Sequence, residues 1–315
     1  MKRKILPFLF LSVLALLSTG CRQAAPPAPS DSSGAAVSSP AAPAGSAPAA
    51  SAVQPSETPQ TEDHVLLTLE APLADGRTLT LEAVGKAVDE CNYGVREVLV
   101  YDEDKLLQTV SVREAIEEVW GYGDGAMAEE FYDYTQCWTS EECMAALDLN
   151  FDGNADFGLF GWPPNNTIPF YYWIWDANAE QYRYAFTLQG VAVSPEAEEL
   201  TSQYKDGPAG SQWITEYYRP GADGMLYLTQ VEVTDWANSQ DADRPVYETW
   251  VLPEDAEPIP AGSSNWSRES DLILVSRAVP TIETHDDNTV SRFTETWELK
   301  DGTLQMTGRE EYHDG

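Results

Sequence analysis

One short run of oxygen-bearing side chains gives the clearest chemical signal in this sequence. Between residues 148 and 156 the chain reads Asp-Leu-Asn-Phe-Asp-Gly-Asn-Ala-Asp, with polar side chains at alternate positions and Gly153 where the backbone must turn. Hard cations such as Ca²⁺ take roughly six to eight oxygen ligands, and a loop with this spacing supplies several of them. We therefore predict a structural calcium site, with side-chain ligands from Asp148, Asn150, Asp152 and Asp156 and a backbone carbonyl from Asn154.

Two other structures could produce the same run. An EF-hand places a bidentate Glu at about the twelfth loop position, and counted from Asp148 that position is Leu159, which excludes an EF-hand. An acidic turn with Gly153 at the bend and no ion fits the same residues. We favour the third interpretation, a calcium loop within a β-hairpin.

The N-terminus has the features of an export signal. Three basic residues at positions 2–4 precede an apolar run, Ile5 to Leu17, which is too short to span a membrane as a helix. Residues 17–21, Leu-Ser-Thr-Gly-Cys, resemble a bacterial lipoprotein box, with Ser18 where that pattern usually has Leu. We expect residues 1–21 to be a lipoprotein signal peptide and Cys21 to carry the lipid. An ordinary cleaved secretory signal is the alternative.

The composition divides the remaining chain into a spacer and a folded part. Residues 22–62 are mostly Ala, Pro and Ser, which cannot bury enough apolar surface to offset the entropy of ordering, so we expect a disordered linker. Residues 63–315 should form a β-rich extracytoplasmic domain, at the cell surface or in the periplasm, which could subdivide near residue 190. The formal net charge of −34 disfavours nucleic acid and favours cations or basic partners, although solubility alone would also explain it.

Alternating apolar and polar residues predict strands along most of the folded part. A hairpin is expected at 97–112, with residues 102–105 as a four-residue loop, and others at 213–233 and 293–311. Further strands are predicted at 64–70, 79–82, 157–160, 170–175, 182–188, 247–252 and 272–279. Ser111 and Glu114 form a capping box that predicts a helix, and residues 127–134 could form a second one. The expected fold class is mainly β, an antiparallel meander, sandwich or propeller-like arrangement with one or two short helices.

The cysteines fit an exported protein. Cys137 and Cys143 flank five residues, a loop that a disulfide can close. Cys91 would then be free and buried, and the other pairings of Cys91 stay open.

One segment resembles proteins that we recognise. The pattern Asp-x-Asn-x-Asp-Gly-x-x-Asp before an apolar strand resembles the integrin-type FG-GAP calcium loop. Together with the aromatic residues 171–176 and 182–184, the segment 145–190 is similar to a group of exported bacterial lipoproteins with an Asn-Phe-Asp-Gly-x-x-Asp loop. Most of that group is uncharacterised, and a few members are calcium-binding all-β proteins that resemble periplasmic lysozyme inhibitors and act as immunity proteins. The resemblance implies Ca²⁺ binding and inhibitor-like capture of a partner.

Binding is the expected activity, and we expect no catalysis. The sequence contains none of the nucleophile-elbow, zinc-protease or phosphate-loop motifs, and its three histidines stand apart from one another. The first hypothesis is a membrane-anchored inhibitor-like module for a basic cell-envelope protein. The alternative is a glycan- or peptide-binding lipoprotein that uses the exposed rings of Trp162 and Trp173. A glycan hydrolase is a distant alternative, because carboxylate pairs must occur by chance in so acidic a chain.

Overall fold

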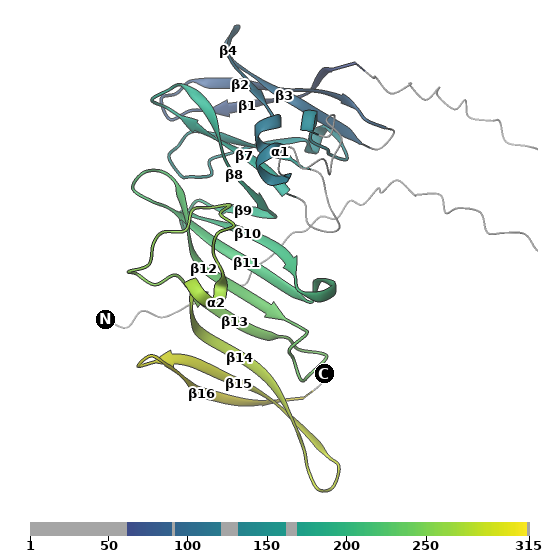
Figure 1. Ribbon diagram of the computed structural model, residues 1–315, viewed down its shortest axis with the longest axis vertical. Coiled ribbons are helices and arrows are strands. Elements are labelled where there is room, and N and C mark those ends of the chain that lie inside the picture. Colours follow the sequence, from purple (N-terminus) through teal and green to yellow (C-terminus); the bar gives the residue numbers. More distant parts are fainter. Residues whose placement is uncertain (1–61, 90–91, 121–131, 162–168, 314–315) are drawn as a thin grey trace, which may run out of the picture. The chain divides into compact units, whose positions relative to one another are not determined.

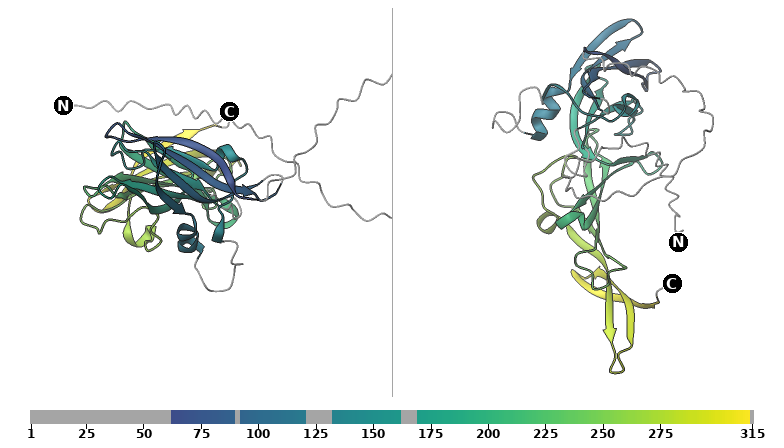
Figure 2. Two further views of the ribbon diagram at one scale, coloured as in Figure 1. Left: turned by 90° about the horizontal axis from the view of Figure 1, so that it is seen from above. Right: turned by 90° about the vertical axis from the view of Figure 1, so that its right-hand side faces the viewer.

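Three antiparallel sheets, each built in the order of the chain, make up the fold of this computed structural model (Figure 1). The structure describes residues 62–89, 92–120, 132–161 and 169–313, so the predictions for Cys21, Cys91, Trp162 and the signal and spacer segments lie outside the described residues. Within each sheet, strands that are consecutive in the chain lie side by side, and the colours of Figure 2 run from blue to yellow in the same order. The predicted mainly-β fold with few short helices is confirmed, and of the arrangements left open the sheets are antiparallel meanders. In the described part of the chain, no helix has the length and apolar character to cross a membrane.

The first sheet contains strands β1 to β4. They span His64–Pro72, Thr78–Ala87, Tyr93–Asp102 and Lys105–Ser111. The alternation of apolar and polar residues predicted in β2 is confirmed, because Leu79, Leu81 and Ala83 are fully buried on one face. The β3–β4 hairpin is tighter than predicted: Asp102 pairs directly with Lys105, and Glu103 has a φ of 52°. Two-residue hairpin turns need such a left-handed residue to match the twist of the strands.

The predicted helix follows this sheet as α1, Arg113–Trp120. It begins one residue later than a capping box at Ser111 requires, and Ser111 Oγ instead accepts a hydrogen bond from the backbone N–H of Arg113 at 3.3 Å. Of the second predicted helix, only residues 132–134 belong to the described part of the chain. The short segments η2, Ser140–Glu142, and η3, Pro208–Gly210, are 3-10 turns, and α2 spans Arg268–Asp271.

The second sheet contains β5 to β8, which span Met144–Leu147, Asp156–Phe160, Pro169–Asp176 and Gln181–Gln189. All five residues of β6 are buried. A single hydrophobic core joins this sheet to the first one, with Leu81 and Val100 from one side and Phe157 and Trp173 from the other. The two four-stranded sheets are therefore two layers around one core.

The third sheet has eight strands, β9 to β16. They span Val191–Ser194, Glu199–Asp206, Gln212–Pro220, Leu226–Asp235, Val246–Val251, Ile273–Thr284, Val290–Lys300 and Thr303–Tyr312. The boundary between the second and third sheets falls at Gly190, near the predicted subdivision. The hydrophobic core of the third sheet nevertheless includes Tyr172 and Phe186 of the second, so apolar packing is continuous across that boundary.

Candidate functional site

The residues of the predicted calcium loop connect β5 to β6. Leu147 pairs with Asp156 at the base of this hairpin. Two hydrogen bonds join the loop to the β1–β2 turn, one from the Ala155 N–H to the Pro72 carbonyl at 2.9 Å and one from the Ala74 N–H to Asn154 Oδ1 at 3.1 Å. Gly153 adopts a φ of 84°, as the sequence predicts for the residue at the bend. The second sheet therefore holds the loop against the first.

The structure gives Asp156, one of the predicted ligands, two backbone partners that the sequence does not indicate. Its side chain is fully buried, and its two oxygens accept backbone N–H groups from Leu149 and Trp175, each at 2.9 Å. Burial raises the pKa of Asp156 to about 8, and the two backbone donors partly oppose that rise. Asp156 thus closes the base of the loop and ties it to β7, and both of its oxygens already have donors.

The outer end of the loop holds the side chains that fit a cation. Asp148 Oδ1 and Asn150 Oδ1 lie 3.1 Å and 3.3 Å from the same N–H of Asp152, so these two oxygens are close to each other. Asp152 Oδ2 is 3.2 Å from the Asn150 amide nitrogen. Within the described residues, no group of three or more His, Cys, Asp or Glu side chains is placed to hold a metal. A cation here would therefore use Asp148, Asn150 and Asp152 together with backbone or water oxygens.

The loop also reaches the third sheet. The Asn150 amide donates a hydrogen bond to the carbonyl of Gly224 in the β11–β12 turn at 3.3 Å. The Asn154 side chain is occupied between Ala74 and Asp152, which leaves its backbone carbonyl as the predicted ligand. The loop thus contacts turns of both neighbouring sheets.

The prediction that Trp173 offers an exposed ring for binding is wrong. Only 2% of Trp173 is exposed, and its ring stacks on Phe157 with 5.1 Å between the ring centroids. It is a core residue because β7 lies inside its sheet, where both faces pack against other side chains. The disulfide between Cys137 and Cys143 is present as expected.

A second candidate site, which the sequence analysis missed, is a cavity in the segment between β13 and β14. Its volume is about 540 Å³, and its apolar lining includes Leu252, Ile259 and Trp266. Two backbone hydrogen bonds hold the segment against β12: Leu228 N–H to the Ile259 carbonyl at 2.8 Å, and Ala261 N–H to the Leu226 carbonyl at 2.9 Å. Prolines at 253, 258 and 260 restrict the backbone of this lining. We call this cavity the acidic pocket.

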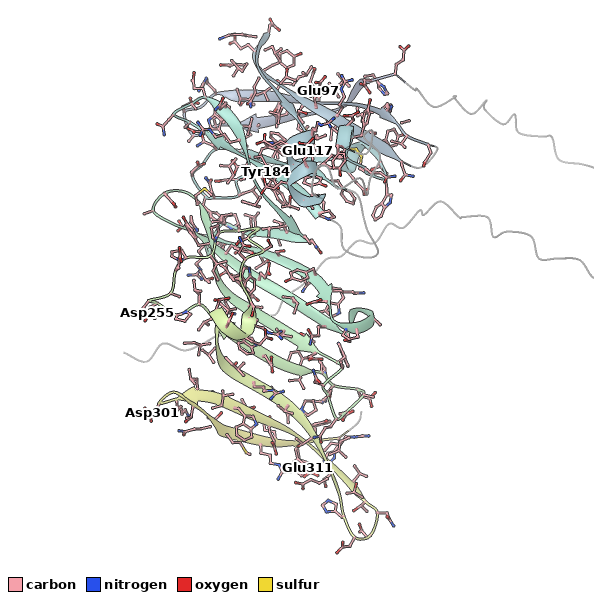
Figure 3. The ribbon with its side chains drawn as sticks, viewed as in Figure 1. Glu97, Glu117, Tyr184, Asp255, Asp301 and Glu311 are labelled. Carbon is pink, nitrogen blue, oxygen red and sulfur yellow. A yellow bond between two sulfur atoms is a disulfide. The ribbon has the colours of Figure 1, made fainter. Side chains whose placement is uncertain are left out.

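The charged residues of the acidic pocket are Asp255, Glu257 and Asp271. Among the described residues that line it, none is Lys, Arg or His. The neighbouring Arg268 pairs with Glu269 at 2.7 Å, and its guanidinium carbon lies 5.3 Å from the ring centroid of Trp250. Asp271 accepts hydrogen bonds from Ser267 and Ser270 within α2, so it shapes the turn as well as adding charge. Figure 3 shows Asp255 projecting from this segment.

The signal for this pocket was present in the sequence as Pro-Glu-Asp-Ala-Glu-Pro at positions 253–258. An acidic stretch between two prolines is typical of an exposed loop, and nothing local indicates that it folds back onto a sheet. A comparison with protein-family models and with curated proteins finds no match to this chain.

Proposed function

We propose that this protein is a lipid-anchored extracytoplasmic binding module that captures a basic protein of the cell envelope, in the manner of an inhibitor. The observation that carries the proposal is the acidic pocket, where Asp255 and Glu257 stand beside the apolar surface of Ile259 and Trp266. A Lys or Arg side chain would place its aliphatic stem on that surface and its cationic group among the carboxylates.

The charge of the whole chain supports the same partner. With 52 acidic residues against 18 Lys and Arg, the chain attracts a basic protein over a distance of several ångströms and accelerates the encounter. Salt shortens this reach, because the screening length falls from about 10 Å at 0.1 M to about 3 Å at 1 M. Capture of the proposed partner should therefore weaken steeply as salt is added.

The anchor and the cation have supporting roles in this proposal. Lipid on Cys21 would keep the module at the membrane, and the Ala/Pro/Ser spacer would let it reach partners beyond the membrane surface. Ca²⁺ held by Asp148, Asn150 and Asp152 would supply positive charge that neutralises the loop carboxylates. Asn150 would keep the loop against the β11–β12 turn.

The proposal is tested by measuring the affinity of the mature protein for a basic lysozyme-type hydrolase at low and high salt. The informative variant is the double change Asp255→Asn and Glu257→Gln. The matched control is Asp301→Asn with Glu311→Gln, which removes the same charge from the C-terminal hairpin (Figure 3). Loss of two pocket carboxylates should weaken binding about tenfold, since each is worth up to about 1 kcal/mol.

Both variants alter the net charge equally, but the control residues lie outside the acidic pocket, so the control should change binding much less than the pocket variant. Equal weakening by the two variants would mean that only overall charge matters. Absence of salt-sensitive binding and of any inhibition of the hydrolase would refute the proposed function itself.

A further inference from the structure

Among the residues that the structure describes, three of the four exposed aromatic side chains lie on or beside one face of the eight-stranded sheet. Trp213 of β11 pairs with Thr234 of β12, and Thr234 pairs with Tyr247 of β13, so the three residues form one row across the sheet. Trp213 is 39% exposed and Tyr247 is 53% exposed. Four aromatic side chains are exposed in the described part of the chain, and Trp236, at the end of β12, is the third of them in this region.

This face is the side of the sheet opposite its core. The residues that alternate with the aromatic ones, Ile214 on β11 and Val233 on β12, pair with each other and are buried in the hydrophobic core of the third sheet. Tyr217 lies four residues after Trp213 on the same strand and therefore on the same face. We call Trp213, Tyr217, Tyr247 and the side chains between them the aromatic face; its strands lie at the centre of the sheet (Figure 1).

The neighbouring loop leaves the aromatic face open. The segment between β12 and β13 crosses the same side of the sheet over β15 and β16, where Asp241 accepts a hydrogen bond from Tyr312 at 2.6 Å and pairs with Arg292. It therefore bounds the aromatic face on one side. Trp213 and Tyr247 remain 39% and 53% exposed, although the Lys205 ammonium lies over the Trp213 ring.

Thr234 stands between the Trp213 and Tyr247 rings, and further polar groups lie beside them on β10 to β12, where several are already oriented. Gln203 donates to Thr215 Oγ1 at 3.2 Å, and the Tyr217 hydroxyl donates to Glu232 at 2.8 Å. The ammonium of Lys205 lies 4.7 Å from the centroid of the Trp213 ring. The face thus offers hydroxyl and amide groups at fixed positions beside flat apolar rings.

The aromatic face is charge-balanced, whereas the chain as a whole is strongly acidic. On β10 to β12 the register places Lys205 and Arg219 on this face together with Glu199 and Glu232, so the ionised groups balance. Arg219 and Glu199 also pair with each other at 2.9 Å. In a chain with a net charge of −34, a charge-balanced surface is complementary to an uncharged ligand rather than to the basic partner proposed for the acidic pocket.

We propose that the aromatic face binds a linear, uncharged glycan. Trp213 and Tyr247 are separated by one strand, which places them about 10 Å apart, since neighbouring strands are about 4.8 Å apart. This span corresponds to two pyranose rings in a chain. The C–H faces of the sugars stack on the two aromatic rings, while the hydroxyls of the sugars bond to Thr234 between the rings and to the Thr, Gln and Glu side chains beside them.

The test titrates the mature full-length protein with two neutral oligosaccharides, cellohexaose and chitohexaose, and follows tryptophan fluorescence and binding heat. The informative variant is Trp213→Ala with Tyr247→Ala, whose fold is checked by circular dichroism and melting. The matched control is Trp138→Ala, which removes a 50% exposed tryptophan elsewhere on the chain. At least one oligosaccharide should bind, at a strength that salt leaves unchanged, and the double variant should lose about tenfold or more in affinity.

Three results would overturn the glycan site. The first is that neither oligosaccharide binds. The second is that the Trp138→Ala control loses as much affinity as the double variant. The third is that the wild type forms concentration-dependent dimers that the double variant abolishes. The last would show that a second copy of the chain covers the face. Because the basic-protein assay uses Asp255 and Glu257, failure of either proposal leaves the other standing.

Discussion

At the scale of single residues, Asp152 and Asp156 show how position within one loop changes the role of a carboxylate. Asp156 is buried and holds two backbone N–H groups, whereas Asp152 is exposed and lies among Asp148 and Asn150. The spacing of oxygen-bearing residues predicts both as ligands. Only the pairing of Leu147 with Asp156 at the strand ends distinguishes them.

Removing Asp152 should abolish the response of the protein to calcium. Ca²⁺ at about a hundred times its dissociation constant should stabilise the folded state by about 2.7 kcal/mol, because it binds only that state. Asp152→Ala should melt at the same temperature with Ca²⁺ and with a chelator. Asp156→Ala should instead lower the melting temperature even in the chelator, since two buried N–H groups lose their acceptor. A calcium-dependent rise that persists in Asp152→Ala would place the ion elsewhere.

Glu216 is a second buried carboxylate with an identifiable effect. It points into the core of the third sheet, where the hydroxyls of Tyr204 and Tyr218 donate to it at 2.8 Å and 2.6 Å. Burial raises its pKa above the ordinary 4.5, although both hydroxyls oppose the rise. The folded state therefore retains a proton that the unfolded state releases, and the free energy of unfolding falls as pH rises above 4.5 toward the folded-state pKa.

The variant Glu216→Gln should lack this pH dependence. Relative to it, the wild type should lose stability between pH 4.5 and the higher folded-state pKa, by at most about 1.4 kcal/mol per pH unit. Chemical denaturation of both proteins at pH 4, 5, 6 and 7 measures the difference. A wild type that instead gains on the variant over this range would show that the tyrosine hydroxyls outweigh burial.

At the scale of elements, one glycine is essential to the first sheet. A Cβ atom at Gly85 would lie 1.8 Å from the carbonyl oxygen of Gly94 on the paired strand, at a bulge between Val84 and Gly85. No side-chain rotation relieves a clash with backbone, so the two strands would have to separate. The glycine in β2 is thus required by the close approach of β3.

The variant Gly85→Ala should destabilise the protein by about 3 kcal/mol or more. The matched control is Gly308→Ala in β16, where a Cβ would meet only ordinary contacts with Thr296 at 3.8 Å and 3.9 Å. That change should be neutral or slightly stabilising, because alanine loses less entropy than glycine on folding. Denaturation midpoints measure both, and equal effects would mean that the bulge can relax.

A strand could be predicted from the sequence where apolar and polar residues alternate clearly between its two faces. Hairpins such as β11–β12 and β15–β16 were predicted because glycine turns separate two alternating strands. β10 was missed because Ser202 and Tyr204 stand on its inner face beside Leu200, which weakens the alternation. β5 and β9 were missed because four residues are too few to define a period.

At the scale of the whole molecule, the sequence predicted the class of fold but not which faces are inside. In β11 both faces carry aromatic residues, so the pattern alone cannot show that Tyr218 is buried while Trp213 is exposed. The same ambiguity misled the interpretation of Trp173, which is in the core. The acidic pocket was unpredictable for another reason: it forms only when the segment after β13 packs beside β12.

The strict chain order of the sheets has a consequence for how the protein reaches its fold. In each of the three sheets, every strand pairs with the strand before it or after it, and most connecting loops are short; the exception is the segment of residues 252–272 between β13 and β14. The entropy lost on closing most of these pairings therefore stays small, since it grows with the length of chain enclosed. A polypeptide that emerges end-first can add each strand to the edge already formed without waiting for distant residues.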